Sequence, residues 1–153
     1  MEPNPSTSDQ ALLEELRRHR AELRESMSAL EDALAAPATA PPWAPRVRAA
    51  LVELSADFRA HIDITEGPNG LYGDLLKTSP RLSGAVASLT REHALISAQV
   101  DKLLARVTAS DGIKDVDRIR VLGMAILARL VRHRQRGSDL VYEAYEFDIG
   151  GET

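Results

Sequence analysis

The sequence predicts an all-α protein that folds as an up-down-up-down four-helix bundle. Hydrophobic residues make up 44% of its 153 residues, enough for one domain, residues 1–153, to bury a core. The chain is rich in Ala, Leu, Arg and Glu, which favour helices, whereas aromatic residues make up only 4%. The prolines and glycines cluster in short segments between long helix-forming stretches.

The first two helices are expected at residues 8–35 and 45–66. A Ser-x-x-Asp capping box at Ser6 favours a helix start there, because its side chains satisfy free amides of the first turn. The proline-rich segment 36–45 ends this helix, since proline lacks an amide donor and clashes with the preceding turn. Pro45 itself is a favourable first-turn residue for the second helix.

The last two helices are expected at residues 79–109 and 115–146. Residues 71–78 are interpreted as a connection with at most one helical turn. Ser79, followed by a proline, marks the start of the third helix, and Asp115 is a plausible cap for the fourth.

Composition excludes several classes of function. The net charge of −4 is mild and the basic residues alternate with acidic ones, which argues against a nucleic-acid partner. The absence of cysteine excludes disulfides and thiolate ligands. No apolar run approaches ~20 residues, so no membrane span is expected, and residues 1–10 lack the features of a signal peptide. A cytoplasmic protein is therefore predicted.

The four histidines fall one on each predicted helix, at His19, His61, His93 and His133. With the register of each helix set by its aliphatic residues alone, every histidine occupies the apolar stripe, which alternates steps of three and four residues. Such a stripe covers about two positions in seven, so four random histidines would all fall on it in about one trial in 150.

The histidines are also expected at one height in the bundle. His19 lies 16 residues before residue 35, and His61 lies 16 residues after residue 45. The corresponding separations are 16 residues for His93 and 18 for His133. At a rise of 1.5 Å per residue, all four lie about 24–27 Å from the same end of the bundle. The sequence thus predicts a layer of imidazoles in the core.

A buried layer of imidazoles predicts a metal site, because each unsatisfied buried group costs about 1–3 kcal/mol and a metal accepts its lone pair. Imidazoles without thiolates suit iron, zinc, copper or nickel, and a nearby carboxylate favours iron. Glu66, five residues after His61, is the best candidate, and Asp139, six residues after His133, is a weaker one. Glu66 needs a distorted helix near Gly67 to turn inward, because five residues rotate a side chain by about 140° net.

Other polar residues near the histidines have less specific expectations. Glu92 is expected to point to solvent or to a neighbouring helix. Tyr72, Tyr142 and Tyr145 are further candidate oxygen ligands or hydrogen-bond donors, although ordinary packing at the end of the bundle is the favoured interpretation for each.

The ordered set of four histidines resembles the hemerythrin-like (HHE cation-binding) family along nearly the whole chain. The matching segments, besides His19, are FRAHIDITEG around His61, TREHALI around His93 and LVRHRQRGSDL around His133, and the tail VYEAYEFDIGGE is similar to that of short actinobacterial-type members. The resemblance implies a four-helix bundle around a di-iron centre, with two irons per chain. It also implies a small diatomic or peroxide ligand such as O2, peroxide or nitric oxide.

The chain departs from the family pattern at the bridging carboxylates. Family members usually place one four residues after the second and last histidines, where this chain has Thr65 and Gly137. A spacing of five residues after the last histidine gives Ser138, so only Glu66 meets that spacing. A mononuclear iron centre is therefore an alternative to two irons.

Three functional hypotheses follow. The first is a non-haem iron protein that binds or senses a small ligand. The second is an iron-dependent oxidase or peroxidase, which would show steady turnover. The third is a metal-free interaction or regulatory bundle that keeps its histidines as a buried polar layer, with a stability indifferent to chelators.

Overall fold

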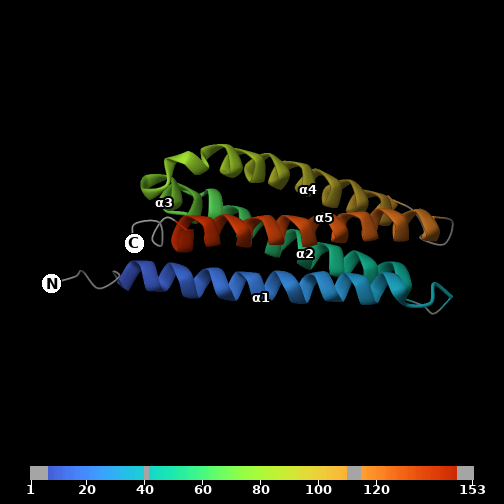
Figure 1. The fold of residues 1–153 in the computed structure, drawn as a ribbon. Coiled ribbons are helices and arrows are strands. Elements are labelled where there is room, and N and C mark those ends of the chain that lie inside the picture. The colour runs from blue at the N-terminus through green and yellow to red at the C-terminus, as the bar shows by residue number, and fades with distance from the viewer. Residues whose placement is uncertain (1–6, 40–41, 110–114, 148–153) are drawn as a thin grey trace.

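Four long helices pack as an antiparallel bundle (Figure 1). The computed structural model describes residues 7–39, 42–109 and 115–147, and it contains no strand in these ranges. Each long helix packs against two neighbours in the order of the chain, and the fourth closes on the first. The predicted all-α four-helix bundle is confirmed. The long helices are α1 (Thr7–Ala35), α2 (Trp43–Glu66), α4 (Ser83–Ala109) and α5 (Val116–Tyr142).

Three short elements complete the described fold, and two of them differ from the predicted boundaries. Residues 71–78, expected as a connection, form a full helix at one end of the bundle (Figure 1). Residues 143–147, expected partly as an extension of the last α-helix, form a π-helical turn. The short elements are α3 (Leu71–Thr78), η1 (Pro80–Leu82) and η2 (Glu143–Phe147).

Helix α2 begins at Trp43, two residues earlier than predicted. Pro45 fits within this first turn because the first amides of a helix have no intrahelical acceptor. Arg120 of α5 fastens this end of the bundle: its guanidinium donates to the carbonyl oxygens of Leu34 and Ala36, each at 2.9 Å. The same guanidinium lies 5.5 Å from the centre of the Trp43 ring, a cation–π contact.

The hydrophobic core consists of two clusters on either side of the histidine positions. The larger fills the bundle toward the 36–42 connection and includes Phe58, Leu23, Ile96 and Leu130. The smaller lies under α3 and η2. Burying each large aliphatic or aromatic side chain contributes about 1.5–3 kcal/mol. None of the helices in the described ranges combines the length and apolar character needed to cross a membrane. The members of the smaller cluster are Leu71, Tyr72, Leu75, Leu82, Val86, Leu89, Leu140 and Ala144.

Candidate metal centre

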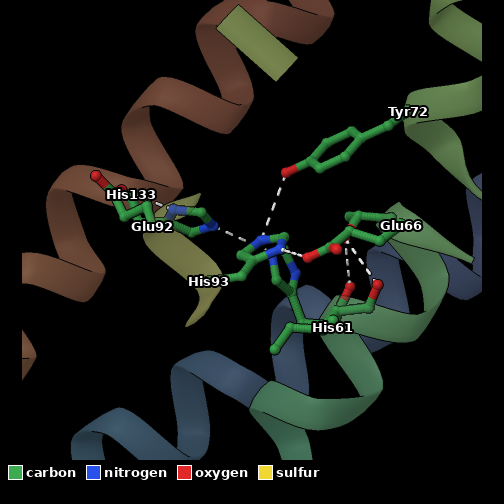
Figure 2. Close-up of polar contacts among 8 residues, drawn as sticks. His61, Glu66, Tyr72, Glu92, His93 and His133 are labelled. Atoms are coloured by element: carbon green, nitrogen blue, oxygen red, sulfur yellow. Dashed lines mark hydrogen bonds and ion pairs between the residues drawn. The ribbon is translucent and has the colours of Figure 1, made fainter. Parts of the chain in front are cut away.

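Three of the four histidines meet between the two apolar clusters (Figure 2). His61 comes from α2, His93 from α4 and His133 from α5, and we call them the histidine cluster. One ring nitrogen of each lies within 4.8 Å of the others, and the Nε2 atoms of His61 and His133 are 3.4 Å apart. His93 and His133 are each 1% exposed. The buried layer expected from helical periodicity is therefore present for three imidazoles.

Phe58, one turn before His61 on α2, packs against all three rings of the cluster. It stacks on His61 with ring centres 5.7 Å apart, and it meets His93 and His133 edge to face at 5.6 and 6.1 Å. At 2% exposure it closes the cluster toward the larger apolar core. The imidazoles are thus held by a rigid aromatic contact as well as by their own helices.

Two carboxylates orient two of the cluster imidazoles from neighbouring helices. The Nδ1 of His93 lies 2.5 Å from Oε2 of Glu66, and the Nδ1 of His133 lies 2.7 Å from Oε1 of Glu92 (Figure 2). Arg136 donates to the second oxygen of Glu92 at 2.7 Å, which holds that carboxylate in place. With Nδ1–H donating to a carboxylate, the lone pair of each imidazole is on Nε2.

Glu66 does not turn inward as expected for a metal ligand. Helix α2 ends at this residue without a π-bulge, and the carboxylate reaches the Nδ1 of His93, on the opposite side of the ring from Nε2. Thr65, at the position of the family's carboxylate, is buried, and its hydroxyl donates to the carbonyl oxygens of His61 and Ile62 at 2.8 and 3.1 Å. The geometry therefore gives Glu66 an orienting role.

Asp139 and His19 lie outside the histidine cluster. Helix α5 continues through Gly137, so six residues after His133 the chain has rotated by about 240° net. The side chain of Asp139 is accordingly exposed and accepts a hydrogen bond from Gln135 at 3.0 Å. The ligand role expected of Asp139 is not met by this geometry.

His19 borders the cluster without joining it. Its side chain is 17% exposed, and its Nδ1 is buried without a hydrogen-bond partner. The nearest carboxylate oxygens, of Glu15 and Glu22, lie 3.8 and 3.7 Å from its ring nitrogens, beyond good hydrogen-bonding distance. It lines the same cavity as His61 and His133.

Tyr72 is the one tyrosine of the three candidates that reaches the cluster. It lies on α3, its ring stacks on His93 with centres 5.8 Å apart, and its hydroxyl is 3.5 Å from Nε2 of that residue. Burial raises the pKa of Tyr72 well above its usual value, so the phenol keeps its proton. Tyr142 and Tyr145 are exposed at the surface. The sequence did not indicate which tyrosine would matter, because α3 was expected to be a connection.

The cluster imidazoles are neutral at physiological pH. Burial, followed by the neighbouring His93 and His133, lowers the pKa of His61 from 6.5 to about 3. Burial and then His133 lower the pKa of His93 to about 3, against an opposing effect of Glu92. Burial also lowers the pKa of His133, although the Glu92 hydrogen bond acts in the opposite direction. Neutral imidazoles are the form that binds metals.

We expect the free energy of unfolding of the metal-free protein to fall as the pH is lowered from about 6.5 toward 3. In this window each cluster histidine is neutral in the folded state and protonated in the unfolded state. The unfolded state then binds more protons, so stability drops by up to ~1.4 kcal/mol per pH unit for each histidine. Glu66 acts in the opposite direction, since burial raises its pKa.

Urea unfolding at a series of pH values, with chelator present, measures this dependence. The variant His61→Gln removes one titrating group, so its slope between pH 6.5 and 3 should be shallower than that of the parent chain. Equal slopes in both proteins would contradict a buried, neutral His61.

Comparisons with known proteins returned no match: no protein-family model, no curated protein and no solved structure matches the chain. The class of protein is therefore the one that fold and site define together. It is an all-α four-helix bundle with a buried cluster of three histidines suited to hold a metal ion.

Proposed function

We propose that this bundle is a non-haem iron protein that holds one iron ion per chain through Nε2 of His61, His93 and His133. The observation that carries this proposal is the meeting of three neutral imidazoles from three helices around one point. Two of them are oriented by carboxylates on Nδ1, the support that metal-binding histidines usually have.

The donor spacing supports a single ion. Three nitrogens bound at about 2.0–2.1 Å to one first-row metal ion are about 3.0–3.4 Å apart, depending on the bond angles. The Nε2 atoms of His61 and His133 are already 3.4 Å apart, and the widest separation in the cluster is no more than 4.8 Å. Small rotations of the imidazoles are enough to close the remainder.

One iron is favoured over two because a bridging carboxylate is missing from the cluster. Glu66 is engaged behind His93, Asp139 is at the surface, and Thr65 and Gly137 have no carboxylate. His19, the fourth expected ligand, is also outside the group. The mononuclear alternative therefore fits these side chains better than the di-iron centre that the family resemblance implies.

The choice of iron rests on the resemblance to hemerythrin-like proteins, since three imidazoles alone also suit zinc, copper or nickel. An iron ion with three protein ligands supplies open coordination positions for a small ligand such as O2, peroxide or nitric oxide. The surrounding residues exclude bulk water from two sides: Phe58 closes one side and Tyr72 stacks on His93 on another. Neutral Tyr72 also presents a hydroxyl hydrogen near the ligand positions.

Metal analysis of protein purified without chelator tests this proposal. We expect about one iron per chain, either as purified or after anaerobic reconstitution with ferrous ion, and a change in visible absorption when nitric oxide is added. Two irons with oxo-bridged ferric absorption would favour the di-iron centre instead. Absence of iron under both conditions would contradict the proposal and leave the histidines as a metal-free polar layer.

A further inference from the structure

A cavity of about 260 Å³ runs along the seam between α1 and α5, beside the histidine cluster. We call it the α1–α5 cavity. His61 and His133 line it on one side, and the arginines Arg17, Arg20 and Arg134 line it as well. Its volume is at the lower end of ligand pockets, which span ~300–1,000 Å³. Much of the remaining wall is apolar: Leu13, Leu16, Leu23, Ile64, Leu71 and Val141.

The positive charge of this cavity is not neutralised by the protein. Among the described residues, none of the three lining arginines forms an ion pair; Arg20 donates to the hydroxyl of Ser138 at 2.7 Å. The Nε of Arg134 is buried and has no hydrogen-bond partner. Burial, and then the nearby cations Arg20 and Arg24, lower the pKa of Arg134. Three cations without a carboxylate partner therefore border an apolar space.

The carboxylates nearest to the cluster do not compensate this charge. Glu66 is hydrogen-bonded to His93, and Glu92 is shared by His133 and Arg136. The cluster histidines are neutral and do not change the balance. A buried guanidinium that lacks a partner is costly, and a bound anion relieves that cost.

We infer that the α1–α5 cavity binds a small organic anion with an apolar tail, of the class of medium-chain carboxylates. The carboxylate pairs with Arg20 and Arg134, since guanidinium groups bind carboxylates through parallel hydrogen bonds. The hydrocarbon tail packs against the apolar lining, including Leu16 and Leu71. An inorganic anion would leave that lining in water, and a neutral apolar molecule would leave the arginines unpaired.

This ligand site goes beyond the proposed metal centre, because it needs no metal ion. His61 and His133 line the same cavity, so the bound anion lies next to the three imidazoles. An organic molecule held there is within reach of whatever chemistry takes place at the cluster.

Isothermal titration of the full chain with octanoate, in chelator, tests the inference separately from metal binding. We expect one octanoate per chain, bound about 10- to 100-fold more tightly than 1-octanol, which has the same tail and no charge. Equal affinity for the two ligands, or no octanoate binding, would overturn the inference whatever the metal analysis shows.

Two arginines on the same helix provide a matched pair of variants. Arg134→Met should weaken octanoate binding about tenfold and leave 1-octanol unaffected, because it removes one charged hydrogen-bonding partner. Arg132→Met removes the same charge from an exposed position two residues away, and should bind octanoate as the parent chain does. An equal loss in both variants would indicate nonspecific attraction and contradict the assigned site.

Gly137 allows the cavity to be filled without altering its charges. It lines the cavity, and a β-carbon at this position would meet nothing within 4 Å. Gly137→Leu should therefore fold, as checked by circular dichroism, and should bind octanoate at least tenfold more weakly because its side chain occupies the space. Full octanoate affinity in this folded variant would place the ligand elsewhere and overturn the inference.

Discussion

Alanine at His93 is expected to abolish stoichiometric iron binding, whereas alanine at His19 is expected to leave it intact. His93 is one of three converging donors, and its loss leaves two imidazoles at the site. The affinity should fall by more than the ~10- to 100-fold that is typical when only an outer hydrogen-bond partner of a ligand is lost. His19 lies outside the cluster, so its replacement removes no donor. Anaerobic titration with ferrous ion measures both affinities.

Glu92→Gln is the internal control for this comparison. Glutamine keeps an acceptor oxygen for the Nδ1–H of His133 but loses the negative charge, so its effect on iron affinity should fall between those of His19→Ala and His93→Ala. Circular dichroism confirms that each variant is folded. Retained iron in folded His93→Ala would exclude the cluster as the ligand set. Equal loss in His19→Ala would restore the fourth histidine as a ligand.

Phe58→Ala is expected to cause the largest loss of stability among single substitutions near the site. Phe58 is 2% exposed and contacts the rings of His61, His93 and His133. Removing a buried phenyl ring costs about 3–5 kcal/mol in the free energy of unfolding, through lost burial and the cavity left behind. Urea unfolding in chelator measures this loss without a contribution from bound metal.

Two further variants define what this result means. Phe58→Leu keeps most of the apolar volume and should cost less than half as much. Val131→Ala, at a position 59% exposed on α5, should change the stability by no more than about 0.5 kcal/mol. A cost for Phe58→Ala as small as that of Val131→Ala would show that the cluster is not packed as described.

The fold was predictable because the local signals agree with one another. Proline and glycine interrupt the chain between stretches of strong helical periodicity, and the four long helices fall close to the predicted ranges. Helix α3 was missed because its eight residues are too short to show a clear period. It forms through tertiary packing: Leu71, Tyr72 and Leu75 are buried under the end of the bundle.

The meeting of three histidines followed from the register of the long helices, whereas the position of His19 did not. Leu12 and Leu16, which set the register before His19, are only half-buried, while Leu23 and Leu30 after it are fully buried. The first half of α1 therefore borders the α1–α5 cavity, where the second half enters the core. A periodic stripe gives the face of a helix but not how closely that face approaches its neighbours.

The carboxylate roles were the least predictable part of the site. Reasoning along a single helix considered Glu66 relative to His61, but its carboxylate reaches His93 on another helix. Glu92 likewise holds His133 across the interface between α4 and α5. Such pairs depend on the relative rotation of packed helices and on side-chain reach, which a sequence pattern does not specify.

X-ray absorption at the iron K edge of the reconstituted protein most directly tests the central claim, a single iron held by three histidines. The account predicts scattering from three imidazoles with iron–nitrogen distances of about 2.1 Å, as for other first-row ions, and no second iron within about 3.5–4 Å. An iron–iron distance in that range, or fewer than three imidazoles per iron, would contradict it.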